Sequence, residues 1–242
     1  MTRTAIITGA SRGIGAAIAR RLASDGLAVV VNYARSREDA DAVVRGITDR
    51  GGQAVAAQAD VADVQAVRSL FDLAEQQFGG VDVLVNNAAV MALAPIAETS
   101  DEMFERMLAA NLRGTFRGMR EAARRLREGG RIINFSSSVV GLYPPTYAAY
   151  AATKAAVEAM THIAAKELGS KRVTVNTVAP GPTATEMFLD GKPETQVDAT
   201  RRGNPQGRLG EPDEIAAAVA FLASPAAQWI SGQTIRVNGG VV

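Results

Sequence analysis

Tyr150 and Lys154 are the residues whose types and spacing most directly indicate chemistry in this sequence. They are four positions apart, so on a helix they would lie on one face, with the ammonium near the phenol. A free tyrosine has a pKa near ~10 and is a poor base at neutral pH. A neighbouring positive charge favours the ionised form. The pair therefore predicts a phenol that can donate or accept a proton.

Two other tyrosines stand close by, Tyr143 and Tyr147, but neither has this spacing. The residues four positions after them are Tyr147 and Ala151, so neither has a lysine one turn along the helix. Three consecutive serines, Ser136-Ser137-Ser138, precede the group. Together with a glycine-rich turn near the start of the chain, they point to hydride transfer.

The glycine-rich turn reads Thr8-Gly9-Ala10-Ser11-Arg12-Gly13-Ile14-Gly15, between the first expected strand and the first expected helix. Backbone N–H groups at a helix N-terminus attract anions, and glycine lets a phosphate approach the backbone closely. The spacing is G-x-x-x-G-x-G and differs from the usual G-x-G-x-x-G fingerprint. A plain tight turn is the alternative, but the position favours a pyrophosphate site.

The end of the second expected strand indicates which dinucleotide would bind. The segment Val31-Asn32-Tyr33-Ala34-Arg35-Ser36-Arg37 contains no acidic residue before Glu38. A carboxylate here would hydrogen-bond the 2′-hydroxyl of NAD, whereas arginine suits a 2′-phosphate. Arg35, helped by Ser36 and Arg12, therefore favours NADP(H), and the alternative is a pair of solvated surface arginines.

Composition excludes several function classes. The chain has 242 residues, 47% hydrophobic and 21% charged, with a net charge of +1 and no basic run of the kind that nucleic-acid binding requires. It contains no cysteine, and His162 is its one histidine. We therefore expect no metal site and no Ser-His-Asp hydrolase. No apolar stretch approaches the ~18 residues of a membrane span, which leads us to expect a soluble, cytoplasmic protein.

Short β-branched runs alternate with longer helical patterns, which predicts a single α/β domain over residues 1–242. We expect a Rossmann-type, doubly wound parallel sheet of about seven strands with helices on both faces. The expected strands are 5–8, 28–33, 53–58, 81–85, 131–135, 173–178 and 234–237. The expected helices are 13–24, 36–50, 63–78, 100–127, 150–168 and 212–223. Residues 181–210 carry mixed signals, so they form either a lid or an ordinary exposed connection.

Several further motifs agree in order and spacing with one family. They are Asp60-Val61, Asn86-Asn87-Ala88, Pro180-Gly181 with Thr183 and Thr185, Arg208-Leu209-Gly210-Glu211-Pro212, and Val237-Asn238-Gly239-Gly240. With the glycine turn and the Tyr150–Lys154 pair, the chain resembles the short-chain dehydrogenase/reductase family over essentially its entire length. It departs from the family at Ala89, where glycine is usual.

The resemblance implies a catalytic set of Asn111, Ser138, Tyr150 and Lys154. The commonest family spacing would select Ser137 in place of Ser138; the local pattern Ser138-Val139-Val140-Gly141 favours Ser138. The implied cofactor contacts are Gly9, Ser11, Arg12, Gly13, Ile14, Gly15, Tyr33, Arg35, Ser36, Asp60, Val61, Asn87, Ala88, Ala89, Tyr150, Lys154, Pro180, Gly181, Thr183 and Thr185.

The implied activity is reduction of a ketone or 3-oxoacyl group with NADPH. Tyr150 would give a proton to the carbonyl oxygen, Ser138 would hold that oxygen, and Lys154 would bind the nicotinamide ribose and lower the pKa of Tyr150. Asn111 would position a water that relays protons. The chain is similar to 3-oxoacyl-[acyl-carrier-protein] reductases, which implies a small-molecule substrate that could be an acyl thioester. The enoyl-reductase branch of the family has more residues between the tyrosine and the lysine than this chain has, so that branch is disfavoured.

Two alternatives remain open from sequence: an NAD-dependent alcohol or sugar dehydrogenase, and a nucleotide-binding regulator without turnover. Family members commonly associate through the helices expected at 100–127 and 150–168, so we expect a homotetramer. Packing within one subunit explains the same apolar surface equally well.

Overall fold

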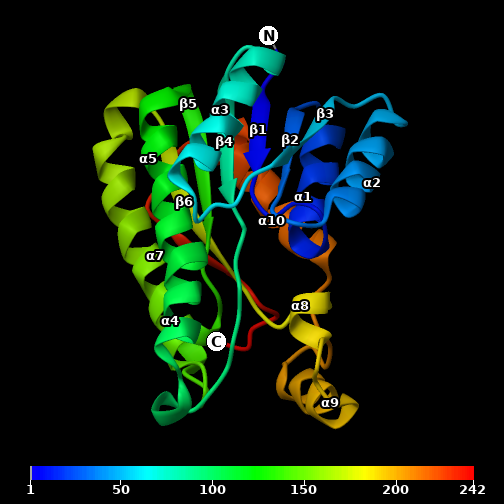
Figure 1. Ribbon diagram of the computed structural model, residues 1–242, viewed down its shortest axis with the longest axis vertical. Coiled ribbons are helices and arrows are strands. Elements are labelled where there is room, and N and C mark those ends of the chain that lie inside the picture. The colour runs from blue at the N-terminus through cyan, green and yellow to red at the C-terminus, as the bar shows by residue number, and fades with distance from the viewer. Residues whose placement is uncertain (1) are drawn as a thin grey trace.

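A single seven-stranded parallel sheet forms the centre of the computed structural model, which describes residues 2–242 (Figure 1). The strand order is β3-β2-β1-β4-β5-β6-β7, and every neighbouring pair is parallel. The strands are β1 Thr4–Ile7, β2 Ala28–Tyr33, β3 Ala54–Gln58, β4 Val81–Asn86, β5 Leu126–Phe135, β6 Thr174–Pro180 and β7 Thr234–Val237. The predicted fold class is confirmed.

The longer helices cover the two faces of this sheet. They are α1 Gly13–Ser24, α2 Arg37–Thr48, α3 Val64–Phe78, α5 Thr115–Arg125, α7 Ala148–Glu167 and α10 Pro212–Ala223. Helices α1, α2 and α10 pack on one face in a core that includes Ile7. Helices α3, α5 and α7 pack on the other, in a core that includes Ile6. Successive strand residues thus enter opposite cores, and for this reason the central strands are apolar throughout.

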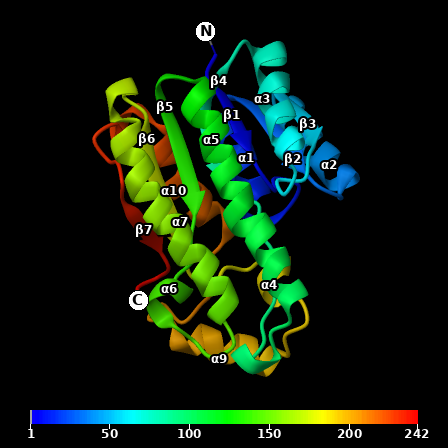
Figure 2. The ribbon, with the colours of Figure 1, turned by 60° about the vertical axis from the view of Figure 1, so that its left-hand side comes forward.

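Figure 2 shows α5 and α7 running across one face of the sheet, with α10 behind it. The shorter elements are α4 Asp101–Met107, the π-helix η2 Leu108–Gly114, α6 Val139–Leu142, α8 Glu186–Leu189 and α9 Glu194–Gly203, with the 3₁₀ turns η1 Ile96–Glu98, η3 Gly169–Lys171 and η4 Pro225–Ala227. Helices α4, α8 and α9 lie beyond the carboxyl ends of the strands (Figure 1).

One sequence prediction needs correction here. The helix expected over 100–127 is divided by η2, where the hydrogen-bond pattern widens to that of a π-helix, and its last residues already belong to β5. The segment 181–210, for which the sequence left a lid and an exposed connection open, contains the helices α8 and α9. Both are short, and prolines and glycines surround them, so the sequence shows no clear helical pattern there.

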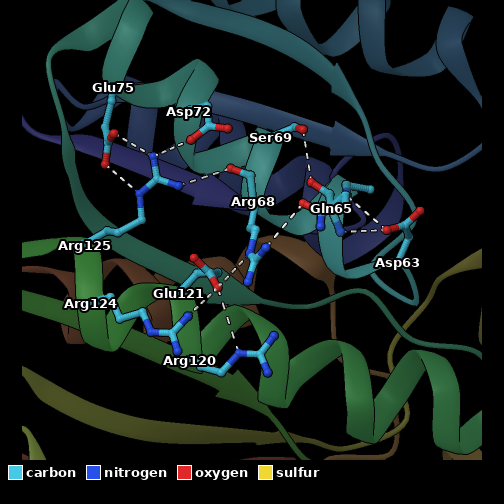
Figure 3. A network of polar contacts seen from close by, with 11 residues as sticks. Asp63, Gln65, Arg68, Ser69, Asp72, Glu75, Arg120, Glu121, Arg124 and Arg125 are labelled. Atoms are coloured by element: carbon cyan, nitrogen blue, oxygen red, sulfur yellow. Dashed lines mark hydrogen bonds and ion pairs between the residues drawn. The ribbon is translucent and has the colours of Figure 1, made fainter.

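A polar network joins α3 to α5 on the outside of the sheet (Figure 3). Arg125 of α5 lies 2.7 Å from Asp72 and 2.6 Å from Glu75 of α3. The nearly buried carboxylate of Glu121 is surrounded by arginines, with Arg124 at 3.2 Å and Arg68 at 3.6 Å. This network holds α5 in place, and α5 continues the π-helix beside the cleft.

Among residues 2–242, no helix combines the length and the apolar character needed to cross a membrane.

The order of the strands reverses between β1 and β4: the chain first builds outward to β3 and then returns to the other side of β1. Ligands of doubly wound sheets bind outside the carboxyl ends of the strands at such a switch point.

Candidate active site

A cleft of about 950 Å³ opens at this switch point. It is lined by the turn after β1, the ends of β2 to β6, the first residues of α7, and α8. The sequence-predicted site residues all line this cleft except Asn111. The fold therefore brings together residues from Gly9 to Thr185 that are far apart in the chain.

At the glycine turn, main chain approaches main chain closely. Gly9 has a φ of +63°, and a Cβ added to it would lie 2.9 Å from Cα of Ala88. A Cβ on Gly15 would lie 2.3 Å from the carbonyl oxygen of Gly9. Asn87 stiffens the turn, because its side-chain amide donates to the carbonyls of Thr8 and Gly9 at 2.9 and 3.0 Å. Only glycine fits at these two positions.

Helix α1 begins at this turn with no side chain capping its first N–H groups and no acidic residue in its first turn. Its N-terminus therefore carries free donors and a partial positive charge toward the cleft. An anion such as a pyrophosphate suits this position.

At the end of β2, Tyr33 is buried, whereas Arg35 is exposed and lines the cleft. Arg35 makes no ion pair among residues 2–242, so its guanidinium is available to a ligand. Arg12, expected to assist it, instead pairs with Glu186 of α8 at 2.7 Å. After the neighbouring strand β3, Asp60 accepts a hydrogen bond from the backbone N–H of Ala62 at 2.8 Å, which fixes the turn there.

Tyr150 and Lys154 lie on the buried face of α7, with side chains that are almost inaccessible. The Lys154 ammonium lies 5.6 Å from the centre of the Tyr150 ring and donates to the carbonyl of Phe135 at 2.9 Å. Burial raises the pKa of Tyr150 to about 12 and lowers the pKa of Lys154 to about 8. The expected depression of the tyrosine pKa is therefore absent from this structure, since burial of the phenol dominates.

Both candidate serines line the cleft. Ser138 is 2% exposed, accepts a hydrogen bond from Asn238 Nδ2 at 3.0 Å, and donates toward the Ala179 carbonyl at 3.4 Å. Ser137 is half-buried, and its hydroxyl accepts from the backbone N–H of Val139 at 3.4 Å. The assignment of Ser138 as the catalytic serine stays a prediction.

Asn111 lies behind the cleft wall. It is fully buried in the π-helix, where its amide accepts from the Val90 N–H at 2.8 Å and donates to the Val90 carbonyl at 2.9 Å. It also donates to Thr153 Oγ1 at 3.3 Å. Its observed role is to fix the segment after β4 against α7, and π-helical turns are frequent at such functional positions.

The segment after β6 closes one side of the cleft. Thr183 donates to the carbonyl of Gly181 at 2.9 Å, and Thr185 caps α8 by accepting from the Phe188 N–H at 3.3 Å. The threonines predicted to contact a cofactor therefore also shape the start of the helix over the cleft.

Further residues line the substrate end of the cleft, most of them in the segments 89–96, 141–147 and 186–203, where the sequence predicts substrate specificity. Arg106 lies outside these segments, and no local pattern in the sequence marks it. Tyr147 lies edge-on to Tyr150, with ring centres 6.5 Å apart. The other residues come from α4, the loop after β4, and the helices over the cleft: Met91, Leu93, Arg106, Leu142, Met187, Phe188, Gln196 and Thr200.

Known proteins share this sequence and this fold. Over residues 9–242 the chain matches the protein-family model described as Enoyl-(Acyl carrier protein) reductase. It is 46% identical to a short-chain type dehydrogenase/reductase of Picea abies, across 99% of this chain and 92% of the relative. It is also 46% identical to NADPH-dependent aldehyde reductase 2, chloroplastic, of Arabidopsis thaliana, across 98% of this chain and 93% of the relative.

Two solved structures extend the comparison. A short chain dehydrogenase from Burkholderia cenocepacia in complex with NADP has a TM-score of 0.94 at 40% identity, covering 99% of this chain and 97% of its own. The angucycline C-6 ketoreductase LanV with bound NADP has a TM-score of 0.94 at 39% identity, covering 99% and 95%. The chain, with its parallel sheet, glycine turn and buried tyrosine–lysine pair, belongs to the short-chain dehydrogenase/reductase family.

Proposed function

We propose that this protein is an oxidoreductase that uses NADPH to reduce a ketone or 3-oxoacyl group to the alcohol. The observation that carries the proposal is the buried phenol of Tyr150, whose ring centre lies 5.6 Å from the Lys154 ammonium in a cleft that Ser137 and Ser138 also line. With a pKa near 12, this phenol stays protonated at neutral pH and is ready to donate.

The residues present fit NADP(H) in particular. The turn around Gly9 and Gly15 excludes side chains where a pyrophosphate would approach, and α1 points free N–H groups at the same place. Arg35 offers a guanidinium suited to a 2′-phosphate, and no acid stands at the end of β2. Relatives and solved neighbours named for NADPH or NADP point the same way.

When bound, NADPH supplies the hydride that adds to the carbonyl carbon. Tyr150 is placed to give its phenolic proton to the carbonyl oxygen, which becomes the alcohol hydroxyl and leaves a phenolate. Ser138 would donate a hydrogen bond to the same oxygen and stabilise its developing negative charge. Lys154 would hold positive charge beside the phenol as it loses its proton, and its ammonium would bind the nicotinamide ribose. Asn111 acts from behind, by fixing Val90.

Association and location are further parts of the proposal. Large apolar side chains remain exposed on α5, α7 and α10 and before β7: Phe116, Ile163, Phe221 and Trp229, the last 97% exposed. A homotetramer would cover such residues. A cytoplasmic location stays a prediction from the sequence.

The test is a panel of aldehydes, ketones and 3-oxoacyl thioesters, with NADPH oxidation followed by absorbance. We expect turnover of at least one class, with NADPH preferred to NADH. If the pure protein bound NADPH but oxidised none of it across the panel, the enzymatic proposal would be rejected in favour of a nucleotide-binding regulator. A clear preference for NADH and an alcohol substrate would favour the NAD-dependent dehydrogenase.

A further inference from the structure

Arg106 places a guanidinium at the substrate end of the cleft. It belongs to α4, which packs against α7, the helix of Tyr150 and Lys154 (Figure 2). Its side chain is exposed and lines the cleft. Among residues 2–242 it makes no ion pair, and Glu105 beside it is bound to Arg113 at 2.9 Å. The positive charge of Arg106 is therefore available to a ligand.

The backbone around Arg106 directs its side chain toward the cleft. Arg106, Ala109 and Ala110 all line the cleft, and residues three and four apart lie on the same face of a helix. The two alanines add little bulk to this wall, because their side chains end at Cβ. Asn111 fixes the helical stretch to the loop after β4 by bonding both backbone groups of Val90. The face that carries Arg106 is therefore held beside the loop that forms the neighbouring part of the cleft wall.

The other charged side chains that line the cleft are accounted for. Arg12 and Glu186 pair with each other at 2.7 Å. Arg35 and Asp60 lie at the nucleotide end, after β2 and β3. The buried lysine of α7 belongs to the group that would transfer the proton. Arg106 is thus the charge that neither the cofactor nor the proton transfer uses.

The side chains that line the substrate end with Arg106 carry no charge. Most are apolar and two are neutral and polar: Met91, Leu93, Leu142, Phe188, Gln196 and Thr200. An isolated positive charge in such surroundings favours a ligand with an apolar chain and a single anionic group. A guanidinium binds a carboxylate through two parallel N–H···O bonds, and the two unit charges cancel.

We propose that Arg106 determines substrate specificity by binding a carboxylate at the end of the substrate remote from the reacting carbonyl. The substrate class is then an oxo acid, in which an apolar chain joins the two groups. This inference rests on the proposed carbonyl reduction and names the substrate class of the same cleft. Arg106 takes no part in proton transfer, which belongs to Tyr150 on α7.

The test compares straight-chain oxo acids of increasing length with their methyl esters, which are neutral. NADPH oxidation by the full-length protein gives kcat and KM for each compound. For at least one length we expect kcat/KM of the acid to exceed that of its ester by about tenfold or more, the gain from a charge-assisted pair that stays partly solvated. Because salt screens such a pair, the acid-to-ester ratio should fall at high ionic strength.

Three variants identify the group that recognises the carboxylate. Arg106→Gln removes the charge, so the acid-to-ester ratio should fall to about one, mainly through KM, because the lost contact is remote from the reacting carbonyl. Arg106→Lys keeps the charge without the planar fork and should retain part of the preference. Arg202→Gln is the matched control, since Arg202 of α9 is also exposed but does not line the cleft. Its ratio should equal that of the wild type.

Equal kcat/KM for acids and esters throughout the series, or a preference that survives Arg106→Gln, would overturn the inference and leave carbonyl reduction intact. Reduction of neutral ketones with none of the acids reduced would also overturn it. Equal falls of the ratio in Arg106→Gln and Arg202→Gln would do the same, because net charge would then explain the preference. A wild-type protein that reduces no carbonyl of any kind would instead contradict the proposed function.

Discussion

The nucleotide end and the catalytic end of the cleft are built by different means. At the nucleotide end, main chain approaches main chain, as Gly9 approaches Ala88, and small residues leave space for a ligand. At the catalytic end, the polar side chains of Tyr150 and Lys154 are buried, and Lys154 donates to the carbonyl of Phe135 at the end of β5. The nucleotide end therefore needs positions without side chains, whereas the catalytic end needs particular side chains. Substitutions should therefore affect binding at one end and chemistry at the other.

The largest expected effect is at the catalytic end. Tyr150→Phe removes the proton donor and keeps the ring, so kcat should fall by roughly 10³-fold or more, whereas NADPH affinity should be nearly unchanged. Steady-state kinetics with fluorescence titration measures both. Tyr143→Phe is the matched control because Tyr143 is 74% exposed and lies outside the cleft lining. Comparable activity in the two variants would contradict the assignment.

Substitution of the two serines should lower kcat by different amounts. Ser138→Ala removes the proposed donor to the developing oxyanion and should lower kcat by about 10²-fold. Ser137→Ala should lower it by no more than about tenfold. The comparison uses kcat at saturating substrate for both variants. If Ser137→Ala were the more damaging, the direct hydrogen bond to substrate would belong to Ser137.

Substitutions at the nucleotide end should change cofactor binding and leave the chemical step unchanged. Arg35→Asp places a carboxylate where a 2′-phosphate would lie, so the preference for NADPH over NADH should fall by roughly tenfold or more, with little change in kcat at saturating cofactor. Arg50→Asp, at an exposed arginine away from the cleft, should leave the preference unchanged. A normal preference in Arg35→Asp would show that another group recognises the cofactor.

The pH dependence of kcat for reduction should reflect the titration of Lys154. With its pKa lowered to about 8, this lysine is charged below that pH and neutral above it, whereas the Tyr150 phenol stays protonated up to about 12. The kcat for reduction should therefore fall as pH rises through about 8. In Lys154→Met we expect a low kcat without this step. A profile that stays flat to pH 10 in the wild type would remove the lysine from this role.

The smallest expected effect is on stability. Raising the pH should increase the stability contributed by Lys154, whereas it should decrease kcat. Because the pKa of Lys154 in the folded protein, about 8, is below its ordinary value of 10.5, the unfolded chain binds more protons between these pH values. Stability from this group therefore rises with pH across that window. Lys154→Met should raise the melting temperature at pH 7 by roughly 5 °C, and the gain should disappear above the window. Calorimetry at both pH values tests this.

The same contrast explains what the sequence could predict. The four-residue spacing of Tyr150 and Lys154 and the place of the glycines between a strand and a helix are local patterns, and the structure reproduces both. The environment of Ser138, by contrast, includes a hydrogen bond from Asn238, one hundred residues further on. No local spacing encodes such a contact.

Other errors have the same origin. The π-helix forms where Asn111 bonds both backbone groups of Val90, a contact across 21 residues. The pKa of Tyr150 was expected to be low from its neighbour on the helix, but it is set by how completely the sheet and loops bury the phenol. Burial arises only in the assembled fold, so one helix turn could not predict its direction.

The ion pair between Arg12 and Glu186 bears on how a ligand reaches the cleft. It connects the glycine turn to α8 across the opening, yet its two side chains are 64% and 70% exposed. Water and salt screen such a pair, so it adds little to stability. Separating α8 from the glycine turn at this ion pair would therefore cost little free energy.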